Sequence, residues 1–345
     1  MSKIEVGVLG ATGSVGQKFI QLLDGHPFFK VTEVAASDRS AGKKYSEAVN
    51  WFLASKIPAD VAGLIVKPCE PVLKCHVVFS ALDASVAGEI ESEFAKNGYM
   101  VISNSKNHRT DTDVPLLIPE VNPDHLELLK IQKYGKGGIV TNPNCSTIGL
   151  VLALKPLADN FGLEAVNVVT MQALSGAGYP GVSSLDIIDN VIPYIGGEEP
   201  KLETEPLKIL GGFNGKGISN YDLKISAQTN RVAVIDGHTE AIQVNLRNKA
   251  SKEDIIKVWK EFRSVPQELN LPFAPINPIH YFTEDKYPQP RLHRDIDKGM
   301  AVSIGRLREC NLFDYKFILI SHNTVRGAAG GAILCGELMK EKGYL

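Results

Sequence analysis

The sequence predicts an α/β protein with two domains, an N-terminal doubly wound parallel sheet and an α+β domain with a mostly antiparallel sheet. Three observations predict this fold class. The chain has 345 residues, which exceeds the usual size of one hydrophobic core. Short apolar runs alternate with helix-like stretches as far as residue 161. After that point long strand-like runs follow one another with fewer helices between them.

In the first half, strand and helix signals alternate in order. Ile4 to Leu9 is a β-branched run, and apolar residues at helical spacing follow it until Gly25 and Pro27, which should end that helix. Further strands are predicted at 31–36, 64–66, 76–82, 99–103 and 137–141, and further helices at 84–97 and 147–161. This alternation is typical of a doubly wound parallel sheet.

The second half should supply the antiparallel sheet. Its strands are predicted at 166–173, 223–233, 237–246, 299–308 and 315–321, and the segment 195–205, rich in Gly, Glu and Pro, is predicted to be a loop. A terminal helix over 323–342 contains small residues at 327–331 and should return to the first domain. We therefore expect one domain from 1–145 with 323–345, and a second domain over 146–322.

A glycine-rich turn follows the first predicted strand. Gly10, Gly13 and Gly16 allow main-chain N–H groups and the next helix N-terminus to hold a pyrophosphate, although the spacing is G-x-x-G-x-x-G instead of G-x-G-x-x-G. An ordinary tight turn is the alternative. Because the turn lies between a strand and an amphipathic helix, we predict a Rossmann-like dinucleotide site. Its residues are Gly10, Thr12, Gly13, Ser14, Val15 and Gly16.

The end of the second strand indicates which dinucleotide binds. Sites for NAD place a carboxylate there, whereas NADP sites place neutral and basic groups for the 2′-phosphate. Ser37, Arg39, Ser40 and Lys43 suit a phosphate, and Asp38 argues against it. The composition favours NADP (NADPH). A solvated basic loop is the alternative.

Cys145 is the best candidate for a nucleophile. It lies in Asn142-Pro-Asn-Cys-Ser146, between a predicted strand and a predicted helix. Unpaired N–H groups and the positive dipole end at a helix N-terminus favour thiolate, so a lowered thiol pKa is expected. The alternative is a small buried hydrophobe that happens to precede a helix.

Thiol chemistry on an acyl group needs an acid or base close to sulfur. Among eight histidines, His238 follows Gly237 in a turn between two long strands, and we predict it as the acid/base. A turn histidine without that role is the alternative.

Composition excludes several classes of partner. The 37 basic and 39 acidic residues nearly balance, so no overall field would recruit nucleic acid or an anionic membrane. No apolar run reaches the roughly 20 residues that a membrane span needs, and the beginning of the chain lacks a signal-peptide pattern. The protein is expected to be cytoplasmic, with reduced thiols, because five cysteines are scattered along the chain. Cys69, Cys75 and His76 lack a second ligand pair, so no metal is expected.

Several motifs together resemble a known family. They are Gly-Ala-Thr-Gly-Ser-Val-Gly at 10–16, the 37–43 loop, Asn-Pro-Asn-Cys-Ser-Thr at 142–147, Asn-Arg-Val at 230–232 with Gly237-His238, and Asn-Thr-Val-Arg-Gly-Ala-Ala-Gly-Gly at 323–331. In this order and over nearly the whole chain they resemble aspartate-semialdehyde dehydrogenase, in its archaeal and fungal branch.

The resemblance implies NADPH-dependent, reversible conversion of aspartyl 4-phosphate to aspartate semialdehyde and phosphate, in lysine, threonine and methionine biosynthesis. It implies that Cys145 carries an acyl thioester and that His238 manages protons. It assigns the substrate to Arg109, Asn144, Gln172, Glu205, Lys208 and Arg231, and the cofactor also to Ser80, Ala81, Ser175, Gly176, Gly178 and Asn323. It also implies that 1–145 with 323–345 bind NADP, that 146–322 is a catalytic and dimerisation domain, and that the protein is a homodimer or homotetramer.

For several of these residues the sequence leaves a plainer role open. Arg231 is seven residues before His238, as expected of an arginine that grips a carboxylate, but it could be a surface strand residue. Glu205 and Lys208 could be one exposed helical ion pair.

Other functions on the same fold remain possible at this point. N-acetyl-glutamyl-phosphate reductase and malonyl-CoA reductase share the thiol and hydride chemistry and differ in the acyl chain. A non-catalytic nucleotide-sensing protein would not need Cys145 at all.

Overall fold

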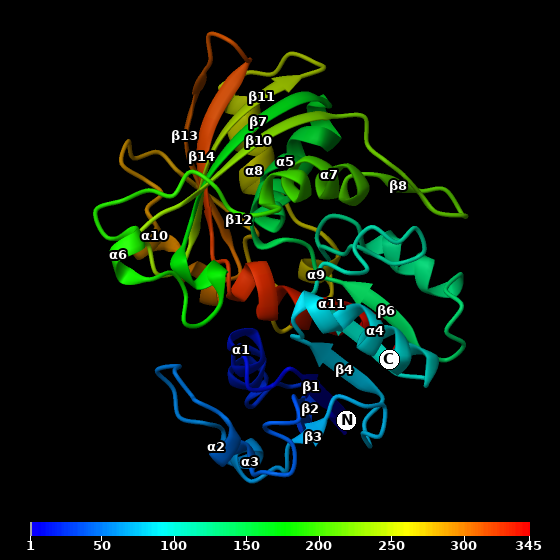
Figure 1. The fold of residues 1–345 in the computed structure, drawn as a ribbon. Coiled ribbons are helices and arrows are strands. Elements are labelled where there is room, and N and C mark those ends of the chain that lie inside the picture. The colour runs from blue at the N-terminus through cyan, green and yellow to red at the C-terminus, as the bar shows by residue number, and fades with distance from the viewer. Residues whose placement is uncertain (1) are drawn as a thin grey trace.

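The computed structural model describes residues 2–345, which form two six-stranded sheets at opposite ends of the molecule and one small two-stranded sheet (Figure 1). The blue and cyan part contains β1 (Ile4–Leu9), α1 (Ser14–Leu23), β2 (Phe29–Ala36), α2 (Tyr45–Ala48), α3 (Ala59–Ala62), β3 (Lys67–Pro68), β4 (Val77–Ser80), α4 (Ala84–Lys96), β5 (Met100–Ser103), η1 (Pro123–Lys130) and β6 (Gly138–Thr141). All its strand pairs are parallel, in the order β3-β2-β1-β4-β5-β6. This is the strand order of dinucleotide-binding folds, and it confirms the doubly wound parallel sheet predicted from the sequence.

The second sheet is mixed and mostly antiparallel, as predicted. Its order is β10-β7-β11-β14-β13-β12, with parallel pairs only at β10/β7 and β12/β13. This part contains α5 (Cys145–Phe161), β7 (Leu163–Gln172), η2 (Leu174–Ala177), α6 (Ser184–Ile187), α7 (Glu198–Ile209), β8 (Gly212–Phe213), β9 (Ile218–Ser219), β10 (Lys224–Arg231), β11 (His238–Leu246), α8 (Lys252–Glu261), α9 (Val265–Glu268), β12 (Ile279–Phe282), α10 (Pro290–His293), η3 (Ile296–Gly299), β13 (Val302–Glu309) and β14 (Tyr315–Ser321).

The chain end returns to the first domain, as the sequence predicted. It begins with a π-helical turn, η4 (Val325–Ala329), and continues as α11 (Gly330–Glu341), so the predicted single helix has two parts. Ile333 and Leu334 of α11 share a core with Val6 and Val8 of β1. In Figure 1 this red segment lies between the two sheets, close to the N-terminus of α5.

The two sheets have separate cores. Helices α1 and α11 cover one face of the parallel sheet, while Phe94 of α4 packs on the other face with Val78 and Val101. Helix α5 covers the mixed sheet, where Leu150 and Leu154 pack among residues of β7, β11 and β14. Helix α5 therefore begins at the junction of the domains and is fixed by the second core. The predicted domain boundaries remain a prediction.

Two predictions about local structure were wrong. The 195–205 segment is not a loop, because α7 begins at Glu198, directly after Gly197 in the left-handed region (φ 71°). Pro200 lies in the first turn, where its missing N–H has no helical acceptor to lose. The third parallel strand is Lys67–Pro68 rather than 64–66, since the main chain of Leu64 and Val66 bonds instead to the 42–45 turn.

Within the described residues no helix is long and apolar enough to cross a membrane.

Candidate active site

A cavity of about 380 Å³ lies at the junction of the two domains, with Cys145 on its wall. Both domains contribute to the lining. The residues named from the sequence that line it are Ser14, Val15, Arg109, Asn144, Cys145, Gln172, Ser175, Gly176, Gly178, Arg231 and Asn323. The predicted nucleophile, the glycine turn and the sheet arginine thus reach one space.

Cys145 is the first residue of α5 and contacts the predicted acid/base directly. Asn144 is the N-cap, and its side-chain oxygen accepts hydrogen bonds from the N–H groups of Ser146 and Thr147. Cys145 Sγ lies 3.1 Å from Nε2 of His238, a residue from β11 that is 93 positions away in the chain. The structure therefore brings the two predicted catalytic residues together.

The predicted low thiol pKa was wrong. Burial, with a smaller effect from Glu198, raises the pKa of Cys145 from 9.0 to about 12. A helix dipole contributes about 0.3–1 kcal/mol, which is less than one pKa unit, so it cannot outweigh this burial. Burial and the charge of Arg231 lower the pKa of His238 to about 3. The resting pair is a neutral thiol beside a neutral imidazole.

Arg231, Gln172 and His238 stand side by side at one end of the mixed sheet. Arg231 pairs with Gln172 across β10 and β7, and the register of β7 with β11 places His238 next to Gln172. All three are buried. Arg231 donates one NH1 bond, to the carbonyl of Ala173. Gln172 and Arg231 of this row line the cavity, and His238 contacts Cys145.

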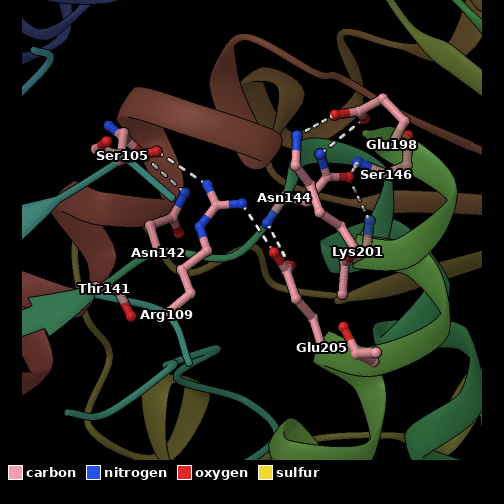
Figure 2. Close-up of polar contacts among 12 residues, drawn as sticks. Ser105, Arg109, Thr141, Asn142, Asn144, Ser146, Glu198, Lys201 and Glu205 are labelled. Atoms are coloured by element: carbon pink, nitrogen blue, oxygen red, sulfur yellow. Dashed lines mark hydrogen bonds and ion pairs between the residues drawn. The ribbon is translucent and has the colours of Figure 1, made fainter. Parts of the chain in front are cut away.

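Sequence reasoning missed Glu198 and Lys201, which line the same cavity (Figure 2). Glu198 accepts hydrogen bonds from Asn144 Nδ2 at 2.8 Å and Gln172 Nε2 at 3.3 Å, and it pairs with Lys201. Burial alone would raise the pKa of Glu198, but the charge and hydrogen bond of Lys201, together with the hydrogen bonds from Asn144 and Gln172, outweigh burial and lower the pKa. Glu198 is an ionised carboxylate inside the cavity.

The structure does not bring Lys208 to this cavity. Its ammonium donates three hydrogen bonds, to the carbonyls of Arg109, Asp111 and Val114, and burial lowers its pKa to about 8. Lys208 lines a neighbouring cavity of about 530 Å³ instead. The helical ion pair left open by the sequence is also absent, because Glu205 bonds to Arg109.

Glu205 does not line the cavity itself but bonds to two residues that do. Its Oε1 accepts from Arg109 NH1 at 2.9 Å, and its Oε2 accepts from the Asn144 N–H at 2.8 Å, as Figure 2 shows. Arg109 also donates to the carbonyl of Asn104. Glu205 thereby ties Arg109 to the N-terminus of α5, and direct substrate contact by Glu205 stays a prediction.

The glycine turn fits a dinucleotide pyrophosphate. Gly10 adopts φ 72°, and a Cβ there would lie 2.6 Å from the carbonyl oxygen of Ala81. Gly13 caps α1 without a side-chain bond, so the first N–H groups of the helix have no side-chain acceptor. Gly16 lets α1 approach Gly10, since a Cβ on Gly16 would lie 2.2 Å from the carbonyl oxygen of Gly10.

The other predicted cofactor residues lie around this turn. Ser37, Arg39 and Lys43 are exposed and Ser40 is half-buried, directly after β2. Ser80 is fully buried, and its hydroxyl donates to Glu91. Its carbonyl also accepts from the Asn104 N–H, so a contact between Ser80 and the cofactor stays a prediction.

Asn323 joins two loops that border the cavity. Its Oδ1 accepts from the Gly237 N–H at 2.8 Å, and its Nδ2 donates to Ser175 Oγ at 2.8 Å. Small residues allow close contact nearby, since a Cβ on Gly327 of η4 would lie 2.7 Å from Cys145 Cβ. Among residues 2–345, no three His, Cys, Asp or Glu side chains gather in a way that could hold a metal ion.

Comparisons with known proteins agree with this geometry. The family model described as semialdehyde dehydrogenase, NAD binding domain, matches residues 5–129, and the one described as semialdehyde dehydrogenase, dimerisation domain, matches residues 154–326. An aspartate-semialdehyde dehydrogenase of Archaeoglobus fulgidus is 51% identical, with 99% of each chain covered. One from Candida albicans is 48% identical, with all of both chains covered.

The chain belongs to the aspartate-semialdehyde dehydrogenase family.

Solved structures of this family share the fold over the whole chain. A crystal structure of the Candida albicans aspartate-semialdehyde dehydrogenase with NADP has a TM-score of 0.92 and 44% identity, with complete coverage of both chains. Aspartate-semialdehyde dehydrogenase II of Vibrio cholerae, complexed with ASA, has a TM-score of 0.79 and 25% identity, with 99% of each chain covered. The similarity to archaeal and fungal members confirms the branch predicted from the sequence.

Proposed function

We propose that the chain catalyses the reversible, NADPH-dependent reductive dephosphorylation of L-aspartyl 4-phosphate to L-aspartate 4-semialdehyde, a step of lysine, threonine and methionine biosynthesis. One observation carries this proposal. A thiol in contact with a histidine faces a cavity bordered by a dinucleotide turn, an arginine and an ionised carboxylate. This set of groups suits an acyl group that bears a carboxylate and an ammonium.

Each end of the substrate has a matching group. Arg231 is the group for the α-carboxylate, because a guanidinium binds it bidentately. Glu198, supported by Gln172, faces the ammonium. Lys201 and Arg109 supply positive charge for the phosphate, so Lys201 takes the place near the phosphate that the family resemblance gave to Lys208. These roles are proposals.

Sulfur takes the acyl group from phosphate. Attack by Cys145 on the acyl carbon forms the thioester and expels phosphate, with His238 in contact with the sulfur. When bound, NADPH supplies the hydride that reduces the acyl group. The glycine turn at 10–16 would hold its pyrophosphate, and Ser37, Arg39, Ser40 and Lys43 its 2′-phosphate.

An assay with purified protein tests this function. NADPH should form from aspartate semialdehyde and NADP only when phosphate or arsenate is present. Turnover that needs CoA and ignores phosphate would favour a malonyl-CoA reductase, and turnover only of an N-acetylated glutamyl substrate would favour the glutamyl enzyme. Absence of any turnover would favour the nucleotide-sensing protein. An aspartyl substrate has a free ammonium group, which an N-acetylated substrate lacks. Glu198, the proposed partner of that group, is therefore the feature that favours the aspartyl substrate.

We also propose a homodimer formed through the second domain, and a location in the cytoplasm. The family model for residues 154–326 is described as a dimerisation domain. Within that range Leu185, Ile188, Val191 and Tyr194 expose between 54% and 91% of their surfaces, which is unusual for apolar residues so close together. All five cysteines are free thiols, which suits a reducing compartment.

A further inference from the structure

A short segment of the second domain connects the two residues proposed to bind the α-carboxylate and the ammonium of the substrate. Ile192 forms an isolated antiparallel bridge with Arg231, in which the Arg231 N–H donates to the Ile192 carbonyl at 2.8 Å and the Ile192 N–H donates back at 3.1 Å. The same segment then runs to Glu198, the first residue of α7. Arg231 and Glu198 are therefore held by one stretch of main chain.

Ile195 lies midway along this segment and lines the cavity. A tight turn fixes it relative to Glu198, since the Glu198 N–H donates to the Ile195 carbonyl at 3.1 Å. Gly197 allows this turn because it adopts the left-handed conformation (φ 71°, ψ 13°), which side chains disfavour. The Ile195 side chain and the Glu198 carboxylate thus reach the cavity from the two ends of one turn.

Ile195 differs in kind from the other lining residues of the second domain. Those residues are polar, as at Gln172 and Lys201, or small, as at Gly176 and Ala177. Within the described residues of 146–322, Ile195 is the only one on this cavity wall with an aliphatic side chain larger than alanine. Such a side chain cannot bind a charged group, so its effect on a ligand is to limit the space beside Glu198.

Glu198 is fixed in place and has little capacity left for a ligand. Its Oε1 pairs with Lys201, and its Oε2 accepts from Asn144 Nδ2 and Gln172 Nε2. A carboxylate has roughly four acceptor sites, so about one remains for the substrate. An acylated amine also carries an N–H that could donate there. The hydrogen bond to Glu198 alone therefore does not exclude an acylated amine, and the space around it has to.

We infer that the Ile195 side chain occupies the space that an N-acyl group would need beside Glu198, and that Ile195 restricts the reaction to substrates with a free α-amine. The inference rests on the proposed function, because it assigns the selectivity of the same site. Ile195 is a specificity-determining residue, since it borders the substrate without moving protons or electrons.

The cavity has no obvious way to make room for an acyl group. Its volume of about 380 Å³ has to hold the substrate, and the main chain at Ile195 is tied down on both sides, by the Ile192 bridge and by the turn to Glu198. An N-acetyl group adds a carbonyl and a methyl group at this point. One methylene too many in a close-fitting apolar pocket typically lowers kcat/KM about 10- to 200-fold.

Substrate-selectivity kinetics test the inference. NADPH formation is measured with NADP and phosphate for L-aspartate 4-semialdehyde and for its N-formyl and N-acetyl derivatives. In the wild type, kcat/KM should fall in that order. Ile195→Ala should raise kcat/KM for the N-acetyl compound, relative to that for the free amine, about 10- to 200-fold, and Ile195→Phe should lower the relative value for the N-formyl compound. An unchanged ratio in Ile195→Ala, or a wild type that accepts the N-acetyl compound as well as the free amine, would overturn the inference.

Two further variants separate selectivity from a general loss of structure. Ile195→Val keeps the branched side chain and most of its volume, so its ratios should stay close to those of the wild type. Ile276→Ala is the control, because Ile276 is 78% exposed and does not line the cavity. A segment that is merely loosened would lower kcat for all three compounds together and leave their ratios unchanged, which would count against Ile195.

Binding without turnover separates this inference from the proposed function. A wild type that does not turn over aspartate semialdehyde would contradict the proposed function. Calorimetry with Cys145→Ala protein then compares L-aspartate with N-acetyl-L-aspartate, with and without Ile195→Ala. A preference for the free amine that Ile195→Ala weakens would support the role of Ile195. A preference that it leaves unchanged, or failure of both compounds to bind, would overturn that role.

Discussion

At the residue scale, the cavity is organised by main-chain and amide groups that hold the charged side chains. Asn144 caps α5 and also bonds to Glu198, while its own N–H bonds to Glu205. The main chain directly before Cys145 is thus held by hydrogen bonds of Asn144 to Glu198 and Glu205. The chemistry of the thiol depends on these neighbours more than on the helix dipole.

Lys201 and Lys208 should behave differently although they occupy equivalent positions in two Glu-x-x-Lys pairs. Lys201→Met removes a charged group from the cavity and should raise the KM for phosphate about 10- to 100-fold, as expected for the loss of one charged hydrogen bond. Lys208→Met leaves three buried carbonyls without their donor, so it should lower the free energy of unfolding by about 1–3 kcal/mol. Steady-state kinetics and urea unfolding separate the two effects. The reverse pattern would restore Lys208 as the phosphate ligand.

Arg231→Lys should mainly raise KM for aspartate semialdehyde. A lysine cannot grip a carboxylate with two parallel bonds, and it would also lose the contact with the Ala173 carbonyl. Initial rates over a range of semialdehyde concentrations measure this. An unchanged KM would count against the assignment of Arg231.

The sequence predicted this residue level in part. The structure brings Cys145, His238, Arg231 and Gln172 together. Local patterns pointed to Cys145 and His238, whereas Arg231 and Gln172 came from the family resemblance, and the roles of all four stay predictions. The sequence could not show that Glu198 and Lys201 line the cavity while Glu205 and Lys208 do not. The pairs are seven residues apart, about two helical turns, so they lie on one stripe and only packing decides which turn meets Cys145.

At the scale of elements, the strands that carry the site continue inward as a second polar row. Below Arg231, Gln172 and His238, the register aligns Thr229, Thr170 and Glu240 across β10, β7 and β11. Glu240 is fully buried, and neither of its carboxylate oxygens has a hydrogen-bond partner in the described chain. Burial raises the pKa of Glu240 well above 4.5, so the side chain is neutral in the folded protein.

Glu240→Gln should therefore stabilise the protein more at pH 7 than at pH 5. In the unfolded chain a glutamate ionises near pH 4.3, whereas folded Glu240 stays protonated, so the wild type loses up to about 1.4 kcal/mol per pH unit from this group as pH rises. The amide removes that loss. Urea unfolding at both pH values measures the difference, with exposed Glu261→Gln as the control. A stability difference that does not change with pH would show that Glu240 is ionised when folded.

Most elements were predicted from the sequence, and the misses have physical causes. Strands β1 and β11 and helices α1 and α4 follow clear apolar periods, so their positions were found within a few residues. Helix α7 was missed because two glycines and two prolines near it signal a loop, although Pro200 falls where a helix tolerates it. The π-helical start of the chain end packs closely on Cys145 through Gly327, a contact that no local sequence pattern reveals.

At the scale of the whole molecule, the fold brings a dinucleotide turn from one domain to a sheet end from the other. The parallel sheet places Gly10 at the carboxyl end of β1, where its order changes direction. The mixed sheet ends in Arg231, Gln172 and His238, and α5 begins between the two sheets. The cavity exists only because both domains are joined through α5 and the returning chain end.

The proposed dimer predicts a particle of about twice the 37.5 kDa chain mass in solution. Ile188→Glu together with Val191→Glu should shift it toward the monomer. The two glutamates would replace exposed apolar side chains and place unpaired charges inside the proposed interface. Sedimentation velocity measures the mass. A double variant with unchanged mass would exclude this segment from the interface, and a monomeric wild type would contradict the homodimer.

The central claim is that Cys145 carries the acyl group between phosphate and hydride chemistry. The most direct measurement is intact-protein mass spectrometry after incubation with aspartate semialdehyde and NADP in the absence of phosphate. We predict a mass increase of one aspartyl group on the peptide that contains Cys145, lost when phosphate is added and absent in Cys145→Ala, which should also have no turnover. An adduct on another residue, or full turnover by Cys145→Ala, would contradict the account.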